Sequence, residues 1–165
     1  MNNAATRPRS PPCPPPLPAL AVCAETDCPY PEPFKSTLGP AAWRGLGDHF
    51  GLTQFGVSLE VIPPGSQSSL RHSHSKVDEF VYVLLGELVL RSNDGETTMR
   101  AGDCMGFKAD DGNAHHLVNR SGAAAQFLVV GTRVAGDVVS YPDDDFRWDR
   151  STGKARAVRR DGTPW

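Results

Sequence analysis

Residues 65–86 read GSQSSLRHSHSKVDEFVYVLLG, and this stretch decides the fold. His72 and His74 stand two positions apart, so on a strand both imidazoles point to the same face and can reach one ion. A short polar stretch, residues 75–78, separates them from Glu79, which heads the next strand. If that stretch loops back, the Glu79 carboxylate lies beside the two imidazoles. The pattern therefore predicts the beginning of a metal site.

The second half of the same stretch predicts a strand that is buried on both faces. Residues 80–85 are apolar at every position, whereas a strand with one solvated face alternates apolar and polar residues. One face is expected to line the inside of a barrel. The other face then needs a second sheet or a second subunit, and from this we predict a homodimer.

Short strands separated by turn residues extend outward on both sides of this stretch. Pro63-Pro64-Gly65 ends one run, and Ser92-Asn93-Asp94-Gly95 forms a tight turn between two others. A short helical turn is expected at about residues 41–46. Strands this closely spaced are typical of a sandwich or barrel. The expected strands are residues 55–62, 79–85, 87–91, 97–100, 104–108, 115–119 and 125–132.

A third imidazole comes from far along the chain, at His115 or His116. Adjacent strand residues face opposite ways, so one of the two should point inward, and the spacing alone leaves both open. Three imidazoles and a carboxylate suit a divalent transition ion: iron, manganese, nickel, cobalt, copper or zinc. Calcium and magnesium, which prefer oxygen ligands, are not expected.

At these positions the sequence resembles the cupin superfamily. The first cupin motif is matched by Gly65, His72, His74, Glu79 and Gly86, with one residue more than usual between Gly65 and His72. The second motif is matched by Gly102, Gly112, His115 and Asn119. Asp110 stands at the usual proline position, and the first interval of this motif is two residues longer than usual, so the Gly102 turn is expected to differ.

The resemblance covers residues 56–133 and implies an all-β fold, a double-stranded β-helix (jelly-roll barrel) with the ion near one mouth. It selects His115 over His116, so the implied ligands are His72, His74, Glu79 and His115, holding one divalent transition ion per subunit. The chain resembles bacterial single-domain (cupin-2-like) proteins. We expect a single cupin domain over residues 36–165, with the barrel core at 55–133 and a C-terminal extension at 134–165.

Residues 1–35 are expected to form a disordered, proline-rich arm, because proline removes backbone donors and resists both helix and interior sheet. Residues 17–24 could be read as a weak secretory signal, but they are short and broken by proline. Neither a disulfide framework nor a cysteine metal site is indicated by the four cysteines. A cytoplasmic location is therefore the default expectation.

The balance of charge argues against nucleic acid or a membrane as partner. The formal net charge is −2, and no apolar run approaches the roughly 18 residues of a membrane-spanning helix. Acidic neighbours offset the basic C-terminal tail, which favours a solvated tail or one packed over a partner subunit. The basic residues are Arg147, Arg150, Lys154, Arg156, Arg159 and Arg160, and the acidic ones are Asp143, Asp144, Asp145 and Asp149.

A metal-dependent enzyme acting on a small polar molecule, of isomerase, lyase or dioxygenase type, is the leading hypothesis. The alternative is a non-catalytic small-ligand-binding or sensor protein. Around the site, Arg71 should face away from the histidines and form a structural salt bridge, and Cys104 is expected in the core. Asn119 could either bond near the site or end a strand.

Overall fold

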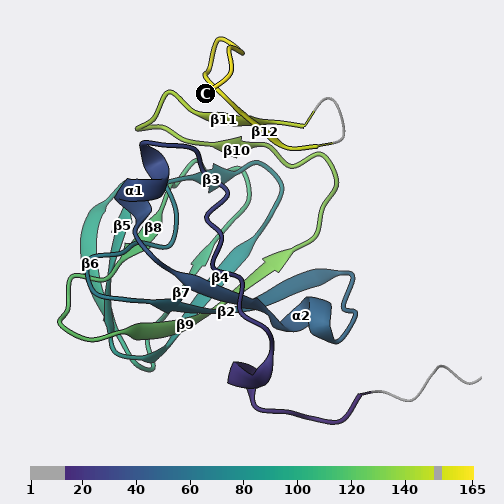
Figure 1. Cartoon of the computed structure of the whole chain (residues 1–165). Helices are drawn as coiled ribbons and strands as arrows, with labels where there is room; N and C mark the ends of the chain where they lie inside the picture. The colour runs from purple at the N-terminus through teal and green to yellow at the C-terminus, as the bar shows by residue number, and fades with distance from the viewer. Residues whose placement is uncertain (1–13, 151–153) are drawn as a thin grey trace, which may run out of the picture.

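The computed structural model describes residues 14–150 and 154–165, and in this part of the chain strands dominate. Two antiparallel sheets face each other and form a barrel, and the C-terminal segment crosses over one end of it (Figure 1). No helix among the described residues is long and apolar enough to cross a membrane. The expected all-β double-stranded β-helix is thus the observed fold.

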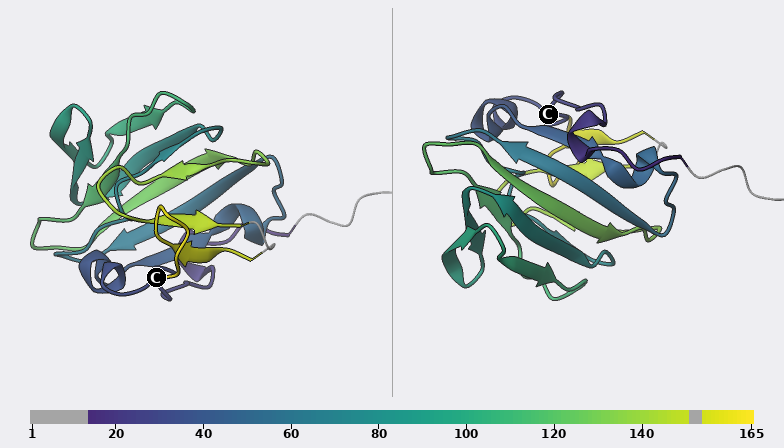
Figure 2. Two further views of the ribbon diagram at one scale, coloured as in Figure 1. Left: turned by 90° about the horizontal axis from the view of Figure 1, so that it is seen from above. Right: turned by 90° about the horizontal axis from the view of Figure 1, so that it is seen from below.

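The larger sheet gathers strands from both halves of the sequence. β2 pairs with β9 over its whole length, and β9 pairs in turn with β4. Figure 2 shows this sheet face-on from below. In the described part of the chain its order is β1 (Ala42–Gly45), β2 (Phe55–Ile62), β9 (Ala125–Thr132), β4 (Glu79–Leu85) and β7 (Cys104–Phe107).

The opposing sheet and the remaining elements close the barrel. Its order is β6 (Gly95–Arg100), β5 (Glu87–Ser92) and β8 (His116–Val118), and residues 67 and 72 add isolated bridges at its edge. Two short pairs lie at the capped end: β3 (Ser73–His74) with β10 (Val139–Ser140), and β11 (Arg147–Asp149) with β12 (Arg156–Val158). The α-helices of the described residues are α1 (Phe34–Leu38) and α2 (Leu46–His49).

The barrel interior is filled mainly by aliphatic side chains from both sheets, which we call the barrel cluster. On β4 the inward residues Val81 and Val83 are 2% and 0% exposed, which is the inner face that the apolar run predicted. Leu88 on β5 meets them from the other sheet. The cluster comprises Ile62, Val81, Val83, Leu88, Leu90, Met99, Phe107, Leu117, Ala125 and Phe127.

A second, aromatic cluster joins the two ends of the described chain above the barrel mouth, and we call it the cap cluster. Helix α1 supplies Phe34 and Leu38, and the C-terminal extension supplies Tyr141 and Phe146. Rings of Tyr30 and Trp148 lie 5.4 and 5.1 Å from the Phe146 ring, centroid to centroid. The extension is therefore a packed cap rather than a solvated tail.

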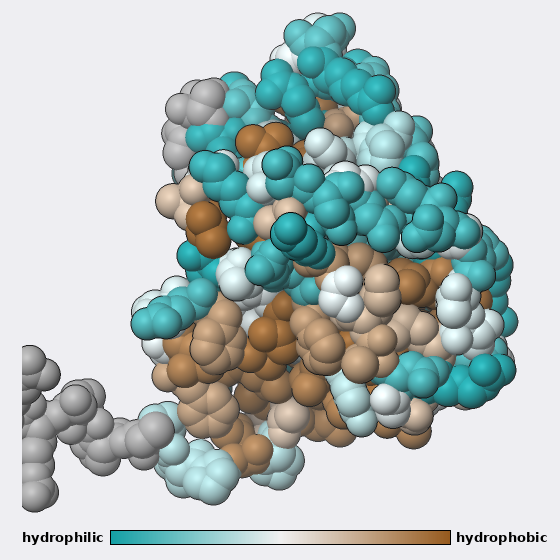
Figure 3. Space-filling model, turned by 180° about the vertical axis from the view of Figure 1, so that it is seen from behind, coloured by the Kyte–Doolittle hydropathy of each residue, from teal (hydrophilic) through white to brown (hydrophobic). Residues whose placement is uncertain are grey.

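The outer face of the larger sheet is apolar and open to solvent. Phe80, Tyr82 and Leu84 on β4 are 41%, 37% and 43% exposed. Figure 3 shows apolar residues gathered over the barrel half of the molecule, below the polar cap. Cys104 belongs to this exposed face, so its expected core position is wrong: its register partner is the outward-facing Tyr82.

Two further expectations differ from the structure at the N-terminal side. The helical turn expected at residues 41–46 is mostly strand β1, because pairing with β2 places Trp43 opposite Glu60, and the helix begins only at Leu46. Residues 1–13 of the predicted arm lie outside the described residues. From Val22 onward the arm is packed on the barrel: Val22 is buried and Glu25 pairs with Trp43.

Candidate metal centre

Three imidazoles from two distant segments meet at the capped mouth of the barrel. His72 and His115 form a reciprocal backbone bridge, with N···O distances of 3.1 and 2.8 Å. Their ring centroids are 5.1 Å apart, and the His74 ring lies 5.0 Å from that of His72. His72 precedes β3 and His74 ends it, so the predicted two-residue spacing brings both rings to one place.

Glu79, the first residue of β4, places its carboxylate among these rings. Its Oε1 lies 3.0 Å from His115 Nε2, and its Oε2 lies 3.8 Å from His74 Nε2. Ligand atoms of His72, His74 and Glu79 all lie within 4.8 Å of one another, a group that could hold a metal ion. His116 points the other way and bonds through Nδ1 to the Ser69 carbonyl. The inward residue of the pair is therefore His115.

The outward-facing Nδ1 atoms are held by partners that fix the ring orientations. His72 Nδ1–H donates to the Leu70 carbonyl at 2.9 Å, and His74 Nδ1–H donates to the Asp137 carboxylate at 2.6 Å. Since these oxygens only accept, the Nδ1 atoms carry the protons and leave the Nε2 atoms free to accept. The His115 ring stacks on Phe107, with centroids 3.4 Å apart. Outer partners of this kind are typical of metal-ligating histidines.

The electrostatics favour a neutral His72 imidazole beside an ionised Glu79 carboxylate. Burial lowers the pKa of His72 to about 4, against the opposing pull of the Glu79 charge. Burial also acts to raise the pKa of Glu79, but the hydrogen bond from His115 and the nearby imidazoles outweigh it and hold that pKa below its usual range. These are the protonation states in which His and Glu bind metals.

The group opens on a cavity of about 150 Å³ inside the barrel, which we call the inner cavity. Glu60 on β2 stands in its wall, and burial together with the Glu79 charge raises the pKa of Glu60 to about 8. Ser68 and Ser69 add hydroxyl groups. The remaining lining is apolar and comes from Val81, Leu117, Phe127 and Val129.

Three neighbouring residues prove to be structural. Arg71 pairs with Asp143 at 2.7 Å, as expected, and so ties the extension to the barrel. Asn119 is fully buried and donates to the carbonyls of Ile62 and Ala123. Of the two roles expected for it, Asn119 therefore has the one at the end of a strand and not the one beside the site. Asp110 has a φ of 62°, which proline cannot adopt, and its N–H donates to the His74 carbonyl. The second motif therefore turns differently here.

Comparison with known proteins agrees with this architecture. The family model of the cupin domain (Cupin_2) matches residues 58–131. The crystal structure of a sugar phosphate isomerase of the cupin superfamily from Silicibacter pomeroyi is 40% identical, covers 92% of this chain and 96% of that chain, and superposes with a TM-score of 0.85. The chain belongs to the cupin superfamily.

Two further cupins match less of the chain. The oxalate-binding protein of Thermotoga maritima is 37% identical over 70 residues, 42% of this chain and 54% of the relative, so the chain spans about half the length of the curated relative it matches. A predicted oxalate decarboxylase from the same organism, 21% identical, covers 71% of this chain and 97% of that chain with a TM-score of 0.57, and shows the shared fold.

Two residues of the site were not found from the sequence. Asp137 lies in a loop 63 residues from His74, and no motif marks it. Glu60 is a single carboxylate in β2, and apolar residues lie on both faces of this strand. The alternation of residues along the strand therefore did not show that the Glu60 side chain points into the barrel. The cupin site is thus a set of four candidate ligands, with a second carboxyl across the cavity and an aspartate behind one imidazole.

Proposed function

We propose that this cupin binds one divalent transition ion through His72, His74, Glu79 and His115. The observation that carries the proposal is the convergence of imidazole Nε2 atoms on the Glu79 carboxylate, while Asp137 and the Leu70 carbonyl hold the opposite ring nitrogens. Ligation through His115 Nε2 requires the proton shared with Glu79 to move to Nδ1, which faces the Asn113 carbonyl.

A metal-dependent enzyme acting on a small polar molecule is the function this arrangement supports best. When bound, such an ion supplies Lewis-acid polarisation of a carbonyl or hydroxyl oxygen. The chain itself contributes a cavity of about 150 Å³ that holds a small molecule, apolar walls that exclude water, and the Glu60 carboxyl as a group able to hold or move a proton. The 40% identical sugar phosphate isomerase favours isomerase chemistry among the candidates.

Metal content of untagged protein purified without chelators tests the first step. We expect about one transition ion per chain in the wild type and its loss in a His72→Ala/His74→Ala variant. His49→Ala, at the end of α2 and outside the site, is the matched control and should keep the ion. A wild type that neither contains nor takes up a transition ion would overturn the proposal.

The proposed enzyme activity is tested by measuring the turnover of candidate substrates. The metal-loaded protein is incubated with a panel of aldose and ketose phosphates, and interconversion is followed by NMR. Isomerisation of one member, with its loss in His74→Ala, would establish the enzyme. Metal-loaded protein that converts no member would remove the isomerase assignment.

A non-catalytic binding protein is the second candidate, and one observation favours it. The matched relative from Thermotoga maritima is an oxalate-binding protein. In this case oxalate should raise the melting temperature of the metal-loaded protein and be recovered unchanged. Oxalate would leave the melting temperature of the His72→Ala/His74→Ala variant unaltered.

We further propose that the apolar outer face of the larger sheet pairs with a second copy of the chain. Phe80, Tyr82 and Leu84 form an exposed row on β4, and such contiguous apolar surface is typical of subunit interfaces. Sedimentation velocity should show a dimer that Tyr82→Glu converts to monomer. A monomeric wild type whose sedimentation coefficient does not change with concentration would overturn this proposal.

A further inference from the structure

A second pocket adjoins the inner cavity, and the Glu60 carboxyl stands in the wall between them. This outer pocket has a volume of about 100 Å³. Glu60 and Ser68 line both spaces. On the sheet, Glu60 lies between Trp43 of β1, which lines the outer pocket, and Phe127 of β9, which lines the inner cavity. The two spaces therefore meet at one titratable side chain.

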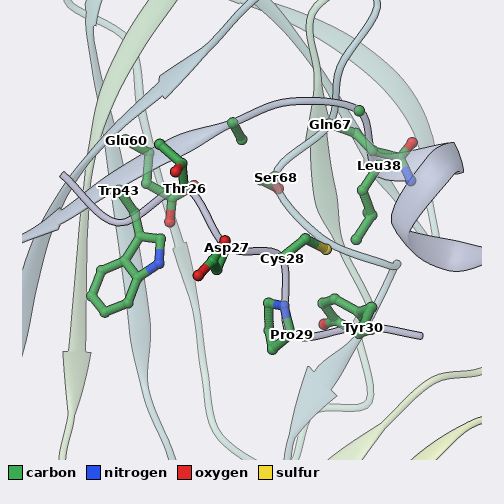
Figure 4. A pocket seen from close by; sticks show the side chains of 12 residues that line it. Thr26, Asp27, Cys28, Pro29, Tyr30, Leu38, Trp43, Glu60, Gln67 and Ser68 are labelled. Carbon is green, nitrogen blue, oxygen red and sulfur yellow. The ribbon is translucent and has the colours of Figure 1, made fainter. Parts of the chain in front are cut away.

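The walls of the outer pocket combine hydrogen-bonding groups with aromatic rings. Figure 4 shows Glu60, Thr26 and Trp43 close together on one side, with Tyr30 across the pocket. Asp27 adds a further polar group from the same N-terminal segment. Aromatic rings can pack against the carbon atoms of a ligand, and oxygen atoms can bond to its hydroxyl groups. This lining therefore suits a polyhydroxylated carbon chain.

The N-terminal segment that forms this wall is fixed in place. Glu25 exchanges two backbone hydrogen bonds with Trp43, at 2.8 and 3.0 Å. Arg44 Nε donates to the Val22 carbonyl at 3.1 Å. The outer pocket is thus a built part of the molecule, made by residues 26–30 of the N-terminal segment together with β1.

Glu60 is free to bond a ligand at this position. Among the described residues its carboxyl has no hydrogen-bond partner, although it lies in the barrel wall. Glu60 is half-buried and lines both spaces, so a ligand in either space can bond to its carboxyl. Its raised pKa keeps the carboxyl largely protonated at neutral pH, so that it can both donate and accept.

We propose that Glu60 is a substrate-binding residue, whose carboxyl bonds a hydroxyl group of a small polyol or sugar that extends from the metal-ligand end of the inner cavity into the outer pocket. The proposal rests on the proposed function in that the reacting oxygen lies at the metal-ligand end. Trp43 and Tyr30 then pack against the far part of the carbon chain. The size of the inner cavity agrees with this, since a cavity of about 150 Å³ accommodates about six heavy atoms.

The test uses the full chain and five uncharged probes: erythritol, xylitol, D-sorbitol, D-mannose and D-fructose. Binding is followed by saturation-transfer NMR and by tryptophan fluorescence, with the metal content of each sample measured in parallel. At least one probe should bind the wild type and change its fluorescence. Glu60→Leu keeps a similar volume but removes the polar group, so it should weaken that binding about tenfold, the loss expected for one hydrogen bond, while its metal content stays unchanged.

Glu87→Leu is the matched control, because it makes the same change on β5 at a partly exposed residue that pairs with Arg100. It should bind the probe as the wild type does. Trp43→Phe keeps an aromatic wall but removes the tryptophan that lines the outer pocket, so it should bind with little loss and with most of the fluorescence change removed. Asp27 is exposed, so Asp27→Ala should weaken binding about threefold without disturbing the core, which keeps the test open if Glu60→Leu fails to fold.

Three outcomes would overturn the inference: no probe binds the wild type, Glu60→Leu binds the probe as tightly as the wild type, or the fluorescence change in Trp43→Phe is as large as in the wild type. None of these outcomes contradicts the proposed metal site. That proposal fails separately if the wild type takes up no transition ion. In that event the same titrations on the metal-free protein still decide whether Glu60 binds the probes.

Discussion

The barrel cluster and the cap cluster are built from different side chains and different parts of the chain. The barrel cluster is mainly aliphatic and comes from strands paired within residues 55–132. The cap cluster is largely aromatic and joins α1 to the C-terminal extension. All four candidate ligands lie on the barrel, yet the cap supplies Asp137 to His74 and sets the Tyr141 ring 6.0 Å from that of His72. The barrel thus supplies the donor atoms, and the cap helps to aim them.

The largest expected effect is on folding stability, and it compares one phenylalanine from each cluster. Phe127 and Phe146 are each 1% exposed. Phe127→Ala should lower the free energy of unfolding by about 3–5 kcal/mol, the usual cost of such a truncation in a closed core. Phe146→Ala should cost about 2–3 kcal/mol, because half-buried Tyr30 and Trp148 can relax into the space.

Urea unfolding of the two variants under identical metal-free conditions measures both values. Phe50→Ala, at an exposed ring that follows α2, is the control and should cost about 1 kcal/mol or less. If Phe146→Ala proved as costly as Phe127→Ala, the cap would have to be regarded as a continuation of the core.

The next effect concerns metal affinity and isolates the contribution of the cap. Asp137→Asn removes the carboxylate that accepts from His74 Nδ1, so affinity should fall about 10–100-fold while the fold is kept. Competition against a chromogenic chelator measures the change. Asp143→Asn breaks another link between extension and barrel, the pair with Arg71, and should leave the affinity unaltered. Equal losses in both variants would mean that the extension acts only through its general attachment.

A third prediction concerns the pH dependence of the metal-free barrel. The pKa of His72 is about 4 in the folded state, below its ordinary value near 6.5, so the unfolded chain binds the proton more readily. The stabilising contribution is present above pH 6.5 and is lost as the pH falls towards 4. His72 should account for about 1–3 kcal/mol of this loss. His72→Gln should flatten the profile of unfolding free energy against pH, and an unchanged slope would contradict the assignment.

The smallest effect lies within the cap cluster. The hydroxyl groups of Tyr30 and Tyr141 are 3.3 Å apart, and both rings are largely buried. Tyr141→Phe should cost about 1 kcal/mol of stability, as for one part-buried hydrogen bond. Tyr30→Phe should cost the same, and the double variant should cost little more than either. Fully additive losses would show that the two hydroxyls act independently.

The same contrast between barrel and cap explains what could be read from the sequence. Alternation and turn residues placed β2 and β9 at their observed bounds, and the His72–Glu79 spacing brought the candidate ligands together. The cap escaped prediction because tertiary packing, not periodicity, decides it. Asp137 has no local pattern that ties it to His74. At residues 42–45, strand pairing with β2 overrode the expected helical turn.

The reciprocal bridge between His72 and His115 has a consequence for the order of folding. These residues are 43 positions apart, and their pairing brings the two arms of the candidate site together. Loop-closure entropy must be lost before such a contact forms, so we expect the two arms to meet after local hairpins such as β5–β6. An ion captured there would act on the last stage of assembly and slow unfolding far more than it speeds refolding.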